Sequence, residues 1–331
     1  VLQKSVQGAP LIAIPHTFSL EVVDHPWNDS LGKGLIFDDS LSPRSIRKAF
    51  EALDGALLIL GQPGSGKTTT LISLAAELID RARADTGQPV PVILDLSSWA
   101  RIGQAFSEWV VEEIAAKYQI PRRYGRVWLA EDQLVLLLDG LDTLPLAARR
   151  SCIEAVNEFR MRQGLTGVAV CCRKMEYEEA ASLLDFNGAV LLEPLGDEQL
   201  CEYFDQGGRE LEQLAAAWAG SAVLREMAQN PLMLNMMTAV FGGQGSRAVE
   251  VSAAGDVRSI EMLFDAYVQR MFDQHIAHER YTQEQSIKWL AWLAAKMERH
   301  NQAIFLIEQI QPSWLPNLRW RRLYMILAGL I

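Results

Sequence analysis

The chain has 331 residues, of which 49% are hydrophobic and 22% charged, a balance typical of a globular protein with room for two or three domains. The formal net charge of −10 argues against a protein that coats DNA or RNA, since such proteins present a basic face. The four cysteines form no C-x-x-C pair and no charged-then-apolar leader follows Val1, so we expect reduced thiols in a cytoplasmic module.

The first 45 residues are rich in proline, aspartate and serine, and their pattern predicts no fold. A short helix is expected from Ser42 to Gly55. Beyond it, apolar runs of strand length alternate with amphipathic stretches, which predicts an α/β domain with a parallel sheet covered on both faces. The expected strands are 56–60, 90–96, 133–142, 167–173 and 188–195, and the expected helices are 67–85, 107–118 and 148–164.

After Pro194 the spacing of apolar residues becomes helical. No convincing strand interrupts it before residues 303–310, where the sequence AIFLIEQI leaves a strand open. Residues 241–258 are rich in Gly, Ser and Ala and predict a linker or loop. We therefore expect an α/β domain followed by a helical region, with the boundary near residues 195–200.

The stretch GQPGSGKT, directly after the apolar run ALLIL, matches G-x-x-x-x-G-K-[ST] at every fixed position. A loop that turns around a phosphate must aim backbone N–H groups inward, so its glycines leave no Cβ in the way. The helix that follows directs its positive dipole end at the same phosphate. A strand before and a helix after favour nucleotide binding over a glycine-rich turn with an incidental lysine. The expected cofactor-binding residues are Gly61, Gln62, Pro63, Gly64, Ser65, Gly66, Lys67, Thr68 and Thr69.

Side chains in the loop and at the ends of later strands complete the expected site. Lys67 reaches the β- and γ-phosphates, and the Thr68 hydroxyl ligates Mg²⁺. Asp139 ends an apolar run and holds the same ion, while Asp142 lies past a glycine and polarises the attacking water. Arg173 ends a further strand, where a guanidinium senses the γ-phosphate or stabilises transferring charge. Taken alone, the two aspartates also fit a strand that ends in a polar turn, and the arginine also fits a residue exposed to solvent after a strand.

The guanine-reading motif N-K-x-D is absent from the sequence, which leaves adenine as the base. The expected cofactors are therefore ATP or ADP with Mg²⁺. A nucleotide is the expected partner, and no specific nucleic acid is predicted.

Six segments together resemble those of bacterial NACHT-type NTPases, which belong to the STAND class of signalling P-loop ATPases. They are LILGQPGSGKTT, PVILDLSSWA, LLLDGLDTL, VAVCCRKMEYE, LLEPLGDEQLCEYF and NPLMLNMM, in the order and spacing of that family. The resemblance implies a five-stranded parallel sheet of the additional-strand type, with the sensor strand between the two Walker strands. A helical lid and a winged-helix-like region would follow.

Carried over by position, the resemblance makes Lys67, Asp142 and Arg173 the catalytic residues, with Asp142 near the attacking water and Arg173 as the sensor arginine. It assigns Mg²⁺ to Thr68 and Asp139. Pro231, in QNPLML, resembles the lid proline that packs on the adenine ring, and it also reads as a helix-starting proline.

Two features depart from the family pattern. Thr143 stands where many members carry a further glutamate, so we expect slow hydrolysis, or hydrolysis that only resets a switch. The winged-helix histidine that contacts the ADP phosphate in some relatives is not assigned here, although His275, His278 and His300 are available. A metal site at the first two of these is not expected, since no cysteine or third histidine lies at ligand spacing.

The expected domains are an N-terminal segment of unknown fold (1–45), the NTPase core (46–198), a helical lid (199–245), a winged-helix-like region (256–316) and a last segment (317–331). In that last segment three arginines precede the apolar residues 323–331. These nine residues are fewer than the ~20 that cross a bilayer. The segment therefore reads either as the start of a membrane anchor or as a last amphipathic helix.

Two functions fit these features, and a third is weighed against them. The first is a signalling switch that ADP holds closed and ATP opens, with slow Mg²⁺-dependent hydrolysis, self-association on activation and a role in sensing stress or phage. The second is a scaffold with structurally bound nucleotide and negligible turnover, which Thr143 favours. The third, a motor such as a transporter subunit, needs an ABC signature such as LSGGQ, and the sequence has none. The first is the function that we expect.

Overall fold

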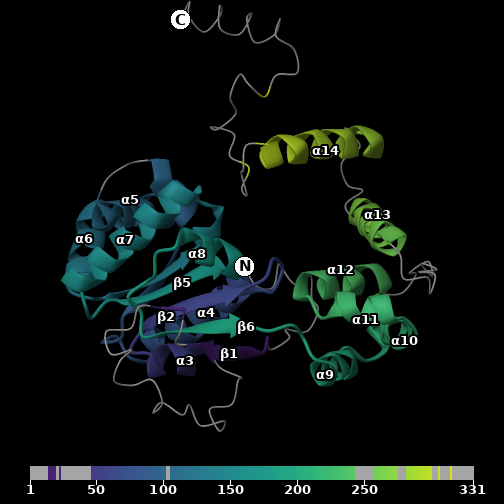
Figure 1. Cartoon of the computed structure of the whole chain (residues 1–331), viewed down its shortest axis with the longest axis horizontal. Helices are drawn as coiled ribbons and strands as arrows, with labels where there is room; N and C mark the ends of the chain where they lie inside the picture. Colours follow the sequence, from purple (N-terminus) through teal and green to yellow (C-terminus); the bar gives the residue numbers. More distant parts are fainter. Residues whose placement is uncertain are drawn as a thin grey trace, which may run out of the picture. The chain divides into compact units, whose positions relative to one another are not determined.

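The computed structural model describes residues 14–19, 22–23, 46–101, 105–242, 257–274, 281–299, 305 and 314. The chain divides into two compact units, Val1–Arg270 and Met271–Ile331. The first unit holds a mixed α/β domain followed by a group of helices (Figure 1).

One sheet of six strands organises the α/β domain. Five strands are parallel, and the order across the sheet places β5 between β2 and β4, which confirms the expected additional-strand arrangement. The sixth strand, β1, was not predicted and pairs antiparallel with β6 at the edge. In sheet order the strands are β1 (His16–Ser19), β6 (Gly188–Leu192), β2 (Ala56–Gly61), β5 (Gly167–Arg173), β4 (Leu134–Asp139) and β3 (Val90–Asp95).

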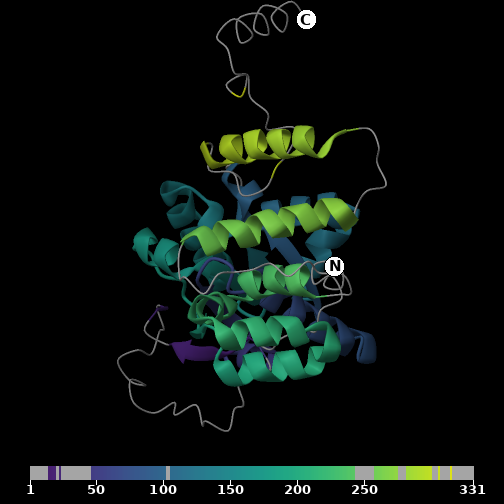
Figure 2. The ribbon, with the colours of Figure 1, turned by 90° about the vertical axis from the view of Figure 1, so that its right-hand side faces the viewer.

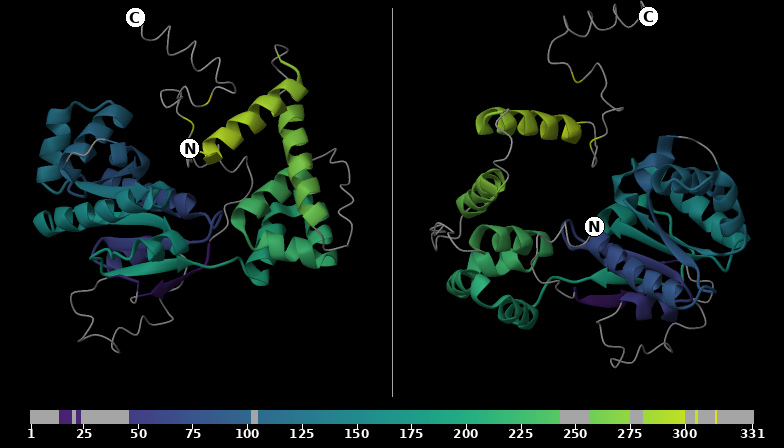
Figure 3. Two further views of the ribbon diagram at one scale, coloured as in Figure 1. Left: turned by 45° about the horizontal axis from the view of Figure 1, so that its top comes forward. Right: turned by 180° about the vertical axis from the view of Figure 1, so that it is seen from behind.

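Helices cover both faces of the sheet (Figures 1 and 3). On one face lie α3 (Ile46–Ala52) and α4 (Lys67–Ala84), and on the other lie α5 (Phe106–Tyr118), α6 (Arg122–Ala130), α7 (Leu146–Arg162) and α8 (Lys174–Ala180). The helices α6 and α8 were not predicted. The first is short and contains a glycine, and the second fills only seven residues after β5, so neither gives a long apolar period.

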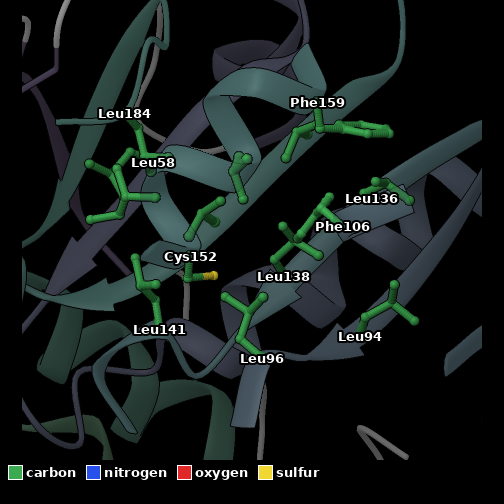
Figure 4. Close-up of a cluster of buried hydrophobic side chains, with 14 of the residues drawn as sticks. Leu58, Leu94, Leu96, Phe106, Leu136, Leu138, Leu141, Cys152, Phe159 and Leu184 are labelled. Atoms are coloured by element: carbon green, nitrogen blue, oxygen red, sulfur yellow. The ribbon is translucent and has the colours of Figure 1, made fainter. Parts of the chain in front are cut away.

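Alternate residues of each central strand enter two separate cores. In β2, Leu57 and Ile59 pack with α3 and α4, whereas Leu58 and Leu60 pack with the opposite helices. Figure 4 shows part of the second core, where sheet side chains meet those of α5 and α7. Labelled there are Leu58, Leu94, Leu96, Phe106, Leu136, Leu138, Leu141, Cys152, Phe159 and Leu184. Burial on both faces accounts for the continuous apolar runs in the sequence.

Two of the predicted strands end three residues earlier than the sequence suggested. The strand predicted at 133–142 stops at Asp139, because Gly140 adopts a left-handed φ of +82° and a short 3-10 turn, Leu141–Thr143, follows. The strand predicted at 188–195 stops at Leu192. The cysteines are free thiols, as expected, with Cys152 buried and the pKa of its thiol raised to about 12 by that burial.

The helices after β6 form a third core of their own (Figure 2). They are α9 (Asp197–Gly207), α10 (Glu212–Gly220), α11 (Ala222–Ala228) and α12 (Pro231–Phe241), with a 3-10 turn, Gly208–Glu210, after α9. Leu200, Leu214 and Met237 are fully buried between them, and Leu263 from α13 (Val257–Gln274) joins this core. The assignment of this stretch as a lid stays a prediction.

The second unit contains the end of α13 and α14 (Gln283–Arg299), whose side chains are all at least partly exposed. Just before α14, Tyr281 packs edge-on against Trp289, with 5.1 Å between the ring centroids. The winged-helix assignment of 256–316 stays a prediction. Within the ranges given above, every helix is too short or too polar to cross a bilayer.

Several expectations fall outside the described residues. They concern most of the linker at 241–258, the candidate histidines at 275, 278 and 300, the open strand at 303–310 and the apolar stretch 323–331.

We predict that Leu58→Ala destabilises the protein by about 2–5 kcal/mol, because it empties space in a fully buried strand. Leu165→Ala is the control, since Leu165 is 86% exposed and its loss should change the free energy of unfolding by about 0.5 kcal/mol or less. Urea denaturation measures both. Equal effects of the two substitutions would contradict the placement of β2 at the centre of the core.

Candidate functional site

A tight turn between β2 and α4 forms the glycine-rich loop. Gly64 and Gly66 have left-handed φ angles of +77° and +90°, which L side chains rarely adopt. A Cβ on Gly61 would lie 2.4 Å from the Ser65 hydroxyl oxygen, and one on Gly64 would lie 2.6 Å from the Asn230 side-chain oxygen. The glycines are therefore required by the turn and by its neighbours.

The start of α4 leaves hydrogen-bond donors available to an anion. Gly66 precedes the helix without a side-chain cap, and the amide N–H groups of a first helical turn have no acceptor within the helix. The Ser65 hydroxyl is buried, and among the described residues it has no hydrogen-bond partner. Donors of this kind at the positive end of a helix dipole fit a phosphate.

Lys67 supplies the positive charge of the loop. Its ammonium group donates hydrogen bonds to the carbonyls of Gly61 (3.1 Å) and Gln62 (2.9 Å). Burial lowers the pKa of Lys67, and the nearby Asp142 carboxylate acts in the opposite direction. The charge is therefore partly desolvated, and an anionic ligand would relieve that cost.

Thr68 and Asp139 meet at the expected metal position. The Thr68 hydroxyl donates to Asp139 Oδ2 at 2.7 Å, and the Gly140 amide donates to Oδ1 at 3.0 Å. Burial raises the pKa of Asp139, while these two hydrogen bonds lower it. A hydroxyl and a carboxylate side by side are hard oxygen donors that fit Mg²⁺, which commonly takes one or two protein oxygens beside phosphate and water.

Asp142 and Arg173 form an ion pair next to the loop. Arg173 Nε lies 2.9 Å from Asp142 Oδ2, and Arg173 Nη1 lies 3.3 Å from the Glu176 carboxylate. The Asp142 side chain is only 11% exposed. Arg173 is paired with Gly61 in the register of β5 and β2, so the pair stands beside the start of the loop. The structure thus brings the four predicted charged residues to one edge of the sheet, and their catalytic roles stay predictions.

The N-terminus of α12 contacts the loop directly. Asn230 donates from its side-chain amide to the Pro63 carbonyl at 2.9 Å, and the Leu232 amide donates to the Gly64 carbonyl at 3.2 Å. The Asn230 side-chain oxygen also caps α12. Pro231 is the first residue of α12, as one reading of the sequence predicted, and its packing on adenine stays a prediction.

The sequence analysis missed several residues around this site. Ile14 reaches the loop, since a Cβ on Gly66 would lie 2.2 Å from its side chain, and nothing in the sequence signals this contact. Asn230 was recognisable as a helix cap before proline. Arg149, which is buried, and Glu176, which pairs with Arg173, looked like solvated helix residues.

The strand order and the glycine-rich loop define a P-loop NTPase of the additional-strand type. The family model described as NACHT domain matches residues 56–204, so this part of the chain is a NACHT domain. Among solved structures, the chain is similar to the one described as "Structure of C. elegans PCH-2", at 15% identity and a TM-score of 0.31, covering 74% of this chain and 72% of that chain. None of the curated proteins matches the chain.

We predict that Lys67→Ala weakens ATP and ADP binding by about ten- to a hundredfold, because a charge-assisted hydrogen bond in a desolvated site is worth about 1.5–3 kcal/mol. Lys117→Ala is the control, because Lys117 bonds the Ile93 carbonyl on the edge strand β3. Titration calorimetry measures both affinities. Near-wild-type binding by the Lys67 variant would contradict the prediction that this loop binds a phosphate.

Proposed function

We propose that this chain is a signalling switch that binds ATP and ADP and hydrolyses ATP slowly with Mg²⁺. The observation that supports it best is the convergence of Lys67, the Thr68–Asp139 contact and the Asp142–Arg173 pair on the carboxyl edge of one parallel sheet. That edge is where open α/β sheets bind their ligands.

In this proposal each side chain has one task. The loop amides and Lys67 bind the β- and γ-phosphates, and Thr68 and Asp139 hold Mg²⁺, which neutralises phosphate charge when it is bound. Asp142 orients the attacking water and accepts its proton. Arg173 stabilises the negative charge that develops on the transferring group.

Slow turnover follows from two features of the turn after β4. Thr143 stands at the position of the family's further glutamate, and its hydroxyl donates to the Gly140 carbonyl at 2.7 Å, so it stabilises the turn. Asp142 contacts Arg173 at 2.9 Å, so one of its carboxylate oxygens is already engaged when it meets the water. Both features leave fewer free carboxylate oxygens to accept the proton of the attacking water.

The contacts of Asn230 and Leu232 with the loop support a switch. They connect α12 to the residues that would carry the phosphates, so a change of nucleotide would reach the helical region through Pro63 and Gly64. The ADP-closed and ATP-open states, self-association on activation and a role in sensing stress or phage are the finer parts of this proposal, and NACHT-family membership supports them.

A scaffold with structurally bound nucleotide is the second candidate. The Asp142–Arg173 ion pair favours it, because each of the two groups neutralises the charge of the other. A measurement of turnover distinguishes the two candidates.

We predict that Asp142→Asn lowers kcat by about a hundredfold or more with little change in affinity, the pattern of a group that acts only in the transition state. Asp139→Asn should instead weaken Mg²⁺-dependent binding itself, since it removes charge from the metal position. Single-turnover hydrolysis and titration of both variants separate these effects. Wild-type hydrolysis by the Asp142 variant would refute its assignment and favour the scaffold.

We also predict a preference for adenine over guanine nucleotides. The sequence has no guanine-reading motif, and the apolar side chains of Ile14, Pro231 and Leu232 flank the loop, where they would accept a base by packing. A competition assay with labelled ADP measures the preference. Displacement by GTP as effective as that by ATP would contradict it.

A further inference from the structure

Arg149 is a charged residue buried inside the α/β domain. It lies in the first turn of α7 and is only 5% exposed. The carboxylate closest to it, on Glu179, lies 3.4 Å away and is mostly exposed, so this ion pair is weak. A buried guanidinium is costly unless its donors are satisfied. Here backbone carbonyls accept from both Nη atoms, whereas the buried Nε has no hydrogen-bond partner among the described residues.

The carbonyls that Arg149 bonds belong to two segments far apart in sequence. Nη2 donates to the carbonyls of Asp142 (3.3 Å) and Leu144 (3.0 Å) in the turn after β4. Nη1 donates to the carbonyl of Glu176 in α8. One guanidinium therefore joins the turn that carries the expected catalytic acid to the helix that follows the sensor strand.

The two segments share a second feature. Asp142 and Glu176 are the residues whose carboxylates hold Arg173, at 2.9 and 3.3 Å. Arg149 thus fixes the main chain of both residues, while Arg173 contacts the side chain of both. If the turn and α8 moved apart, Arg173 would lose one of its two carboxylates.

We propose that Arg149 is a positioning residue, which sets the distance between Asp142 and Arg173 by holding the backbone of Asp142 and Glu176 together. The proposal rests on the slow ATPase function given above. A planar guanidinium with several fixed donors suits this task, because a lysine ammonium on a flexible stem cannot reproduce its geometry. The residue acts through Asp142 and Arg173 and does not contact the nucleotide itself.

Arg160 offers a matched control on the same helix. It is also partly buried in α7, where it donates to the Asp185 carbonyl and lies over the Phe186 ring, with 5.1 Å from its Cζ to the ring centroid. It thus ties α7 to the segment before β6, well away from Asp142. Arg149→Lys and Arg160→Lys each remove a guanidinium that bonds backbone, but only the first affects the proposed geometry.

The test compares these two variants in the full chain of 331 residues. Arg149→Lys should lower kcat, and the rate constant for single-turnover hydrolysis, by about ten- to a hundredfold, because misplacing a reacting group by about 1 Å slows a reaction by about a hundredfold. KM and the affinity for ADP should stay near wild type. Arg160→Lys should lower Tm and keep kcat. In an Asp142→Asn background, Arg149→Lys should have no further effect on kcat, since the group through which it acts is gone.

Hydrogen–deuterium exchange gives a readout that needs no turnover. Arg149→Lys should raise exchange in residues 140–144 and 174–178, whereas Arg160→Lys should raise it near 183–187. Equal loss of kcat in both variants, additive effects with Asp142→Asn, or unchanged exchange at 140–144 would each overturn the proposal. A wild type without turnover would refute the ATPase function, and exchange would then decide the role of Arg149 by itself. If Arg149→Lys fails to fold, Glu176→Gln tests the contact between α8 and Arg173 instead, because the Glu176 side chain is partly exposed. An unchanged kcat in that variant would overturn the proposal.

Discussion

The register of the parallel sheet is the constraint on which the rest of the site depends. Gly61 at the end of β2 is paired with Arg173 at the end of β5, and Asp95 at the end of β3 is paired with Asp139 at the end of β4. The strands β2, β4 and β5 are packed on both faces, so a slip of one residue would move their side chains into the opposite core. Packing therefore fixes the register, and the register fixes the distance between loop, acid and arginine.

At that edge of the sheet, burial disfavours the charged forms of several side chains, and hydrogen bonds within the chain offset part of this effect. The pKa of Lys67 is lowered and that of Asp139 is raised, both because of burial. Loop carbonyls accept from Lys67, and Thr68 donates to Asp139. Main-chain carbonyls accept from both Nη atoms of Arg149. The charges held at the expected phosphate and metal positions are thus the ones that a ligand would stabilise further.

Two segments from outside the central strands close around the glycine-rich loop. Ile14, just before β1, approaches Gly66, and Asn230, at the start of α12, approaches Gly64. A side chain at either glycine would collide with these neighbours as well as with a phosphate. The glycines thus serve the packing of the loop against the rest of the chain, in addition to the left-handed turn that the motif itself requires.

The sequence by itself determined the local features: five apolar strands, the loop at 61–68, the acids at and just after the end of β4, and the arginine that ends β5. Each of these features is a short run or motif of adjacent residues, so it can be recognised without knowing the tertiary structure. Tertiary structure alone decided that β1 adds a sixth strand, that Arg173 pairs with Asp142, and that Arg149 is buried. In sequence a buried arginine looks the same as a solvated one, because part of what surrounds it comes from distant residues, here Glu176 and Glu179, which are 27 and 30 residues away.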